Sequence, residues 1–206
     1  MMSSGLDRRK SRSGCGLLPP NPNQWENEHN GLDLRNDLGI GVNTLLSHVD
    51  AFALYPHVQV LPHGDVPAAA AYIDHFRTVG SSSWSGLAIR LSDEVELVIY
   101  NDSHPQNRVR ATLMEELFHI RLKHPRSVIR VFATSDPTRT HDGAIEAAAY
   151  GSGAAALLPY VSLKKLLAVG TSAATIAGTF GVSRELVAYR MKVTKLYSQH
   201  RMRAAQ

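Results

Sequence analysis

Three side chains that can bind a metal ion or transfer a proton lie close together within residues 107–124, namely Glu115, Glu116 and His119. On a helix, Glu115 and His119 would lie one turn apart on the same face, with Glu116 on the flank. In the motif H-E-x-x-H, two histidines at this spacing bind a metal ion and the Glu between them activates a water molecule. Here Glu115 stands at the position of the first His. Because carboxylates also bind metal ions, the segment predicts a metal site with an unusual first ligand.

The polar residues of this helix also have an ordinary interpretation. Glu115 and His119 share an arc of the helical wheel with Arg108, Thr112 and Lys123, as on a solvent-exposed face. The apolar residues of the same segment, however, cover an arc too wide for a surface helix. We therefore expect the polar arc to face a cleft. A metal ion in that cleft needs a third ligand from another part of the chain.

Glu146 is the candidate third ligand. It is the only charged residue between Gly143 and Leu163, in a segment rich in alanine. A carboxylate on so apolar a helix is costly to bury unless a cation meets it, and a metal bound by Glu115 and His119 would be that cation. Alternatively, Glu146 is exposed in the first turn of its helix, where the helix dipole favours an acid. The residues alone leave both interpretations open.

The elements that must position these residues follow from hydrophobic periodicity and turn signals. We predict helices over 24–38, 43–54 and 66–79 and a strand over 57–61. Alternating apolar residues in 84–91 and 94–100, separated by Ser92 and Asp93, predict a β-hairpin that leads into the central helix. An edge strand of that sheet could hold an extended peptide by strand addition. A short strand over 127–133 and a polar loop over 134–142 are expected next.

The last segment, Ser172 to Tyr197, predicts two short helices joined by a turn. Gly181 supplies the turn and Ser183 an N-cap, as in a helix-turn-helix. Such a pair can read DNA or pack on the core; packing is the default, and DNA binding is possible but not favoured. The sequence therefore predicts an α+β fold, in which a small β-sheet lies beside the central helix and a C-terminal helical pair of helix-turn-helix type follows.

Length and composition allow one sizeable core, with 206 residues of which 44% are hydrophobic. We expect a disordered basic tail over residues 1–22, a main domain over 23–165 and a C-terminal helical segment over 166–206 packed on it. The single cysteine, Cys15, excludes an intramolecular disulfide and favours a reducing compartment, the cytoplasm. No apolar run predicts secretion or membrane insertion.

The net charge of +4 is unevenly distributed along the chain. Residues 161–206 carry eight basic residues and one acidic residue, whereas residues 13–160, which contain the candidate site, are acidic on balance. A basic end can meet nucleic acid or an acidic partner. It can equally serve solubility alone.

The two candidate segments together resemble the ImmA/IrrE family of metallopeptidases, over about residues 40–195. The family's first pattern, R-x-x-x-T-x-x-H-E-x-x-H with a further His about a turn later, is matched by Arg108, Thr112, Glu115, Glu116, His119 and His124. Its second pattern, E-x-x-A-x-x-[FY]-A-x-x-L-L-x-P, is matched by Glu146, Ala149, Leu157 and Pro159. The second match is partial, because Ser152 stands where the family has an aromatic residue, and Gly153 and Ala156 replace an Ala and a Leu.

The resemblance implies Glu115, His119 and Glu146 as metal ligands, with Glu116 as the general base that takes a proton from the attacking water. It implies a divalent metal, with zinc favoured and manganese or iron as alternatives, because a second carboxylate makes the ligand set harder. Two carboxylates would also neutralise the ion and make the bound water less acidic, so Glu115 puts activity in question more than metal binding. His104 and His124 could support the site or lie on the surface.

The function implied by the resemblance is that of a cytoplasmic, metal-dependent endopeptidase acting on a regulatory protein, a repressor with a helix-turn-helix domain. The alternative is a non-catalytic pseudopeptidase that acts as a protein- or DNA-binding regulatory module. Glu116 favours chemistry, because a pseudoenzyme does not need a carboxylate at the position of the base. The missing first His favours the alternative.

Overall fold

The structure of the protein is a computed structural model that describes residues 16–67, 74, 77, 78, 80, 84–91, 95–125 and 143–197. The strand expected over 127–133 and the loop expected over 134–142 lie outside the described residues, as do residues 1–15 of the expected tail. Residues 19–24 precede the first long helix and are tied to the fold: the Nδ2 of Asn21 donates a hydrogen bond to the carbonyl oxygen of Val193 at 2.9 Å, and Pro19 is buried. The chain is thus fixed before residue 22, where the expected tail ends.

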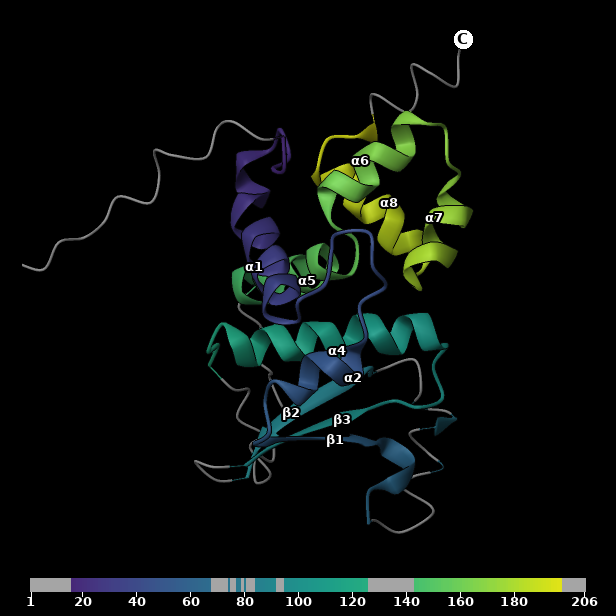
Figure 1. Cartoon of the computed structure of the whole chain (residues 1–206). Helices are drawn as coiled ribbons and strands as arrows, with labels where there is room; N and C mark the ends of the chain where they lie inside the picture. The colour runs from purple at the N-terminus through teal and green to yellow at the C-terminus, as the bar shows by residue number, and fades with distance from the viewer. Residues whose placement is uncertain are drawn as a thin grey trace, which may run out of the picture.

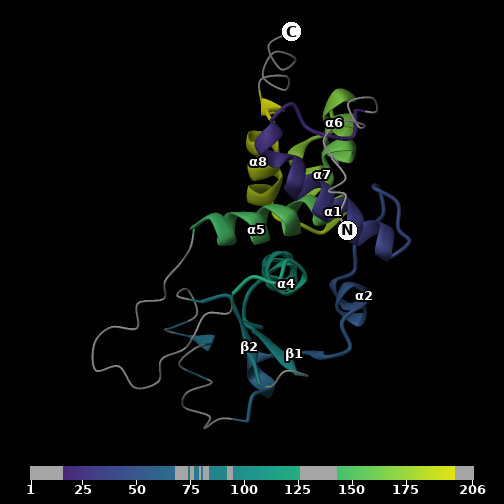
Figure 2. The ribbon, with the colours of Figure 1, turned by 90° about the vertical axis from the view of Figure 1, so that its left-hand side faces the viewer.

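The central helix α4 (Gln106–Arg121) lies between a small sheet and the helix α5 (Gly143–Leu157), as Figures 1 and 2 show. On its other side, α5 packs against α1 (Trp25–Asp37). The apolar arc of α4 was predicted to be too wide for a surface helix, and this position between two layers explains it. The fold is mixed α+β, as the sequence predicted.

The helix α5 is buried over most of its length because it is packed on two sides. A Cβ atom added at Gly31 of α1 would lie 2.6 Å from the backbone nitrogen of Ala156, so only glycine allows this approach. The fully buried hydroxyl of Ser152 accepts a hydrogen bond from Asn30 at 3.1 Å and donates one to Asn27 at 3.3 Å. The departure at Ser152 from the family pattern therefore has a structural reason: α1 occupies the space that an aromatic side chain would need.

The sheet has the strand order β1-β3-β2, built from β1 (Val58–Pro62), β2 (Gly86–Arg90) and β3 (Glu96–Tyr100). β2 and β3 pair antiparallel, with Gly86 opposite Tyr100, which confirms the predicted hairpin. β1 pairs parallel to β3. Within the described residues, β2 is an edge strand, and both β2 and β3 contact α4.

Two of the predicted helices differ from those observed. The helix α2 (His48–Ala53) begins five residues later than the prediction from residue 43, because the hydroxyl of Ser47 accepts a hydrogen bond from the Asp50 backbone N–H at 3.2 Å and caps the helix there. In the predicted helix 66–79, Val66 and Pro67 are not helical, whereas Asp74 and Arg77 are; most of the remaining positions lie outside the described residues. Short 3₁₀ turns cover Pro22–Gln24 and His63–Asp65.

Three helices complete the chain: α6 (Tyr160–Ala168), α7 (Ala173–Phe180) and α8 (Arg184–Val193). Gly181 ends α7 with a φ of +59°, and Ser183 caps α8 by accepting a hydrogen bond from the Leu186 N–H at 3.1 Å, as predicted. Phe180 and Val187 are buried in the same apolar core as α4 and α5. The expected domain boundary at residue 165 falls inside α6.

A fully buried ion pair joins the first long helix, α1, to the last helix, α8. Arg190 of α8 donates a hydrogen bond to the Glu28 carboxylate of α1 at 2.5 Å and another to the Leu158 carbonyl at 3.0 Å, while Glu28 also accepts one from the Tyr160 N–H at 2.6 Å. Arg190 and Glu28 are both 0% exposed. Arg190 therefore serves the fold and is not presented to DNA. In the described part of the chain, no helix combines the length and apolar character needed to cross a membrane.

Candidate metal centre

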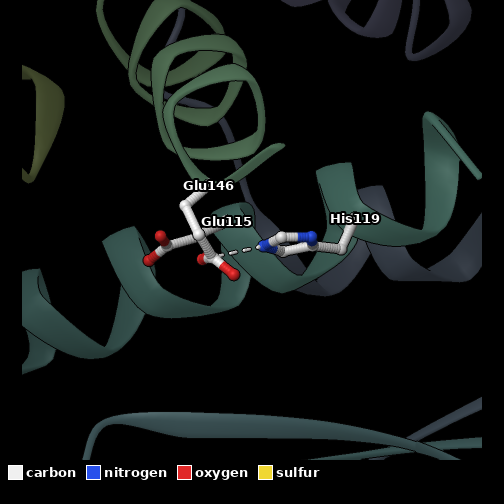
Figure 3. A group of neighbouring side chains, drawn as sticks. All are labelled: Glu115, His119 and Glu146. Atoms are coloured by element: carbon white, nitrogen blue, oxygen red, sulfur yellow. Dashed lines mark ion pairs between the residues drawn. The ribbon is translucent and has the colours of Figure 1, made fainter. Parts of the chain in front are cut away.

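The side chains of Glu115, His119 and Glu146 converge at the crossing of two helices. Glu115 and His119 lie one turn apart on α4, and Glu146 reaches them from the first turn of α5 (Figure 3). One potential ligand atom from each residue lies within 4.8 Å of the other two. The distance from His119 Nε2 to the nearer Glu146 oxygen, Oε2, is 3.4 Å. The structure thus brings together the three residues that the sequence suggested as metal ligands.

The spacing and chemistry of these donors fit a divalent metal ion. Bonds of about 2.0–2.1 Å in a tetrahedral shell place neighbouring ligand atoms about 3.4 Å apart. The His119 and Glu146 atoms already have this separation, and Glu115 is within 4.8 Å of both. One imidazole and two carboxylates suit zinc, and they also suit manganese or iron.

His119 and Glu146 are less exposed than the residues at the two ends of the polar arc of α4. The side chain of His119 is 13% exposed and that of Glu146 is 35% exposed, whereas Arg108 and Lys123 lie on the surface. The arc therefore faces a cleft at its centre, as expected. Glu146 lies in the first turn of its helix and is partly exposed, and its carboxylate also lies 3.4 Å from His119, so its position is compatible with either interpretation.

The other ring nitrogen of His119 has a partner in His124. The two Nδ1 atoms are 3.1 Å apart, and the rings meet edge to face with centroids 5.1 Å apart. A metal ion on Nε2 of His119 requires the ring proton to lie on Nδ1, where it is donated to Nδ1 of His124. His124 is thus placed to hold the orientation and tautomer of His119 that metal binding would need. This supporting role was one of the two that the sequence left open for His124.

Glu116 lies on the flank of α4 that faces the edge strand. A Cβ atom added at Gly86, the first residue of β2, would be 2.6 Å from Cγ2 of Thr112 and 3.5 Å from Cγ and Oε1 of Glu116. Near this point, Arg108 donates a hydrogen bond to the hydroxyl of Ser85 at 2.9 Å. The strand therefore passes close to α4 beside Glu116. Glu116 thus presents a carboxylate, a group that can accept a proton from water, next to the edge strand.

The structure places His104 in the turn before α4. Its Nε2 is 3.3 Å from Nδ2 of Asn101. Asn101 is buried, and its Oδ1 accepts hydrogen bonds from the backbone N–H and the hydroxyl of Ser103. His104 thus contacts the residue that organises the turn from β3 into α4. The contact of His104 with Asn101 therefore helps to position the start of α4.

A cleft of about 570 Å³ adjoins Glu115. Its walls come from α4, from Ser85 before β2, from Tyr150 of α5 and from the first turn of α8, where Ser183, Glu185 and Leu186 line it. Sequence reasoning missed Tyr150, although its spacing of one turn from Glu146 was a usable signal. The contribution of α8 had no signal in the sequence, because it depends on how distant helices pack.

Comparison with known proteins agrees with this geometry. A family model described as the IrrE N-terminal-like domain, peptidase M78, matches residues 71–192, more than half of the chain. The match is narrower than the resemblance over about residues 40–195, since it leaves out α1, α2 and β1. No curated protein and no solved structure matches the chain. With its helix-borne Glu and His group, the chain is a metallopeptidase-like protein that belongs to the IrrE N-terminal-like, or ImmA/IrrE, family.

Proposed function

We propose that the protein is a metal-dependent endopeptidase that cleaves a regulatory protein, a repressor of the helix-turn-helix type. The observation that carries the proposal is the convergence of Glu115, His119 and Glu146 at ligand spacing, with Glu116 next to Glu115 in the chain and close to Gly86 of the edge strand. A divalent ion held there would polarise the scissile carbonyl and acidify a water molecule. Glu116 would accept a proton from that water and pass it to the leaving amine.

The edge strand β2 suits an extended peptide substrate. Within the described residues, β2 is paired on one side only, with β3. A substrate strand that hydrogen-bonds to the other side of β2 would run past Gly86 and bring its backbone next to Glu116. The cleft beside Glu115 would then receive a substrate side chain. A folded repressor would have to present such an extended segment, which a linker between domains supplies.

The first experiment measures metal content in protein purified without a metal-affinity tag. We expect about one divalent ion per chain, and loss of the ion in His119→Ala and Glu146→Ala, because each change removes one of three ligands. Glu26→Ala is the matched control, since Glu26 is an exposed carboxylate of α1. A full complement of metal ion in both His119→Ala and Glu146→Ala would contradict the assignment of the site.

The second experiment tests cleavage by co-expressing the protein with the helix-turn-helix regulators encoded near its gene. Wild-type protein should shorten one of them, and Glu116→Gln should keep its metal yet lose cleavage, because the amide cannot accept the proton. If neither wild type nor Glu115→His cleaves any of these regulators while metal is bound, the pseudopeptidase function replaces this one.

If the protein were instead a pseudopeptidase that binds DNA, Arg190 could not contact the DNA. Of the basic residues on α8, Arg190 is buried against Glu28, while Arg184 and Lys192 remain exposed. The first turn of α8, which a helix-turn-helix presents to bases, here lines the cleft shared with Glu115. These contacts support packing and cleft formation as the role of the C-terminal helices.

A further inference from the structure

The cleft beside Glu115 is lined by a tyrosine, Tyr150, that has no role in the proposed reaction so far. Tyr150 lies on α5 one turn after Glu146, so the two side chains share a helix face. Tyr150 also lines the same cleft as Glu115. A single tyrosine thus lines the cleft beside Glu115 and lies one helical turn from Glu146.

The ring of Tyr150 is held by a second tyrosine. Tyr189 of α8 meets it edge to face, with ring centroids 4.9 Å apart and planes at 67°. Both residues are half-buried, and Tyr189 is absent from the described residues that line the cleft. The pair therefore restricts the rotation of Tyr150 while leaving its side chain on the cleft wall, and edge-to-face packing of this kind is stabilising.

The environment keeps the Tyr150 hydroxyl protonated. Burial raises the pKa of Tyr150 above its usual value of 10.0, and Tyr189 and the Glu115 carboxylate raise it further. A neutral phenol is a hydrogen-bond donor.

We propose that Tyr150 is a catalytic residue whose hydroxyl donates a hydrogen bond to the carbonyl oxygen of the scissile peptide and stabilises the negative charge that develops there. The inference rests on the proposed peptidase function. When water adds to the carbonyl carbon, the C=O π electrons move to the oxygen, and the Tyr150 O–H bond stays intact as it donates to that oxygen. The proton of the water goes to Glu116 and then to the amine as the C–N bond breaks. Fixed donors of this type contribute roughly 10²–10³-fold to kcat.

The test compares Tyr150→Phe with Tyr189→Phe, two substitutions that keep both rings and remove one hydroxyl each. The probes are a phosphonamidate tripeptide of Ala-Phe-Leu, which carries the tetrahedral oxyanion, and the amide tripeptide of the same sequence. Binding to zinc-loaded protein is measured by calorimetry. Tyr150→Phe should weaken phosphonamidate binding about tenfold or more, because a hydrogen bond to a charged group is lost. Its metal content and melting temperature should match those of wild type, and its affinity for the amide peptide should fall by a smaller factor than its affinity for the phosphonamidate, because the hydrogen bond to a neutral carbonyl is weaker.

Tyr189→Phe should leave both affinities within about twofold of wild type, since Tyr189 is not among the described residues that line the cleft. Equal phosphonamidate affinity in wild type and Tyr150→Phe would overturn the assignment of Tyr150 and leave the peptidase function standing. Failure of metal-loaded wild type to bind the phosphonamidate would instead overturn the peptidase function, and the inference with it. On a regulator that wild type cleaves, Tyr150→Phe should lower kcat with little change in KM.

Discussion

Glu115 decides the charge of the candidate metal centre. With two carboxylates and one imidazole, the ligands cancel the charge of a divalent ion, whereas two histidines and one carboxylate leave one positive charge. A less positive ion withdraws less electron density from water, so the water in the site deprotonates at higher pH. We therefore expect Glu115, the residue that departs from the family pattern, to affect the reactivity of the site more than its affinity for the metal ion.

This charge difference predicts the pH dependence of cleavage. Wild-type activity should rise with pH into the alkaline range. Glu115→His preserves the one-turn spacing to His119 and restores the positive charge, so its activity should be greater near neutral pH and its profile should shift to lower pH. The measurement is cleavage of the co-expressed regulator, followed with purified components from pH 6 to about pH 9.5. Identical profiles for the two proteins would show that the charge of residue 115 does not control the reaction.

At the scale of elements, the distance between α4 and α5 sets the geometry of the ligand group. Gly153 of α5 lies against the backbone of α4, where an added Cβ would be 3.1 Å from the carbonyl oxygen of Met114 and 3.2 Å from the backbone nitrogen of Glu115. Backbone atoms cannot rotate away as a side chain can. A larger residue at this point must separate the helices that carry Glu115 and Glu146.

Gly153→Ala should therefore weaken metal binding by about tenfold, equivalent to about 1.4 kcal/mol, and lower the free energy of unfolding by about 1–3 kcal/mol. Competition with a chromophoric chelator and denaturant unfolding measure the two effects. Gly178→Ala is the matched control, because a Cβ on that α7 glycine meets no atom within 4 Å and alanine favours the helix. Unchanged metal affinity in Gly153→Ala would mean that this contact does not position the ligands.

The start of α2 predicts a pH dependence of stability. Burial and the nearby Arg110 guanidinium lower the pKa of His48 below its usual value of 6.5, and Asp50 offsets this only in part. Below pH 6.5 the unfolded chain therefore binds a proton at His48 more readily than the folded protein, and the free energy of unfolding falls as the pH falls.

His48→Gln should remove this contribution. The difference in unfolding free energy between wild type and variant should be constant above about pH 7 and should shift in favour of the variant on acidification. Denaturant unfolding at matched ionic strength from pH 5 to about pH 8 measures it. A difference that stays constant across the whole range would contradict the lowered pKa of His48.

At the scale of the whole molecule, the Glu28–Arg190 pair joins α1 to α8 and to the turn between α5 and α6. Removing one partner of a buried pair leaves the other charge without compensation. Arg190→Ala should therefore lower the free energy of unfolding by about 3–5 kcal/mol. Lys192→Ala removes an exposed cation from the same helix and should cost less than about 0.5 kcal/mol.

Thermal and denaturant unfolding of both variants test this prediction, and similar stability of Arg190→Ala and Lys192→Ala would contradict it. The buried pair also changes how DNA binding must be tested. A loss of DNA binding in Arg190→Ala would report a disturbed fold, so Arg184→Ala and Lys192→Ala are the informative substitutions.

Local features of this protein followed from the sequence alone. The period of a helix fixes which side chains share a face, so Glu115 and His119 were paired before the structure was known. Alternation of apolar residues fixed the hairpin of β2 and β3, and short-range hydrogen bonding fixed the cap at Ser183. The same reasoning placed the start of α2 too early, since Ser47 was not recognised as its cap.

Contacts between distant segments were decided by the tertiary structure. The sequence left two interpretations of Glu146 open, and only the tertiary structure shows that α5 crosses α4 and sets the Glu146 carboxylate 3.4 Å from His119. The sequence also gave no sign that Arg190 would be buried, that Gly86 would pass beside Glu116, or that α8 would line the cleft. Periodicity determines the faces of each element, but the sum of many weak packing contacts determines which faces meet, and no local pattern records that sum.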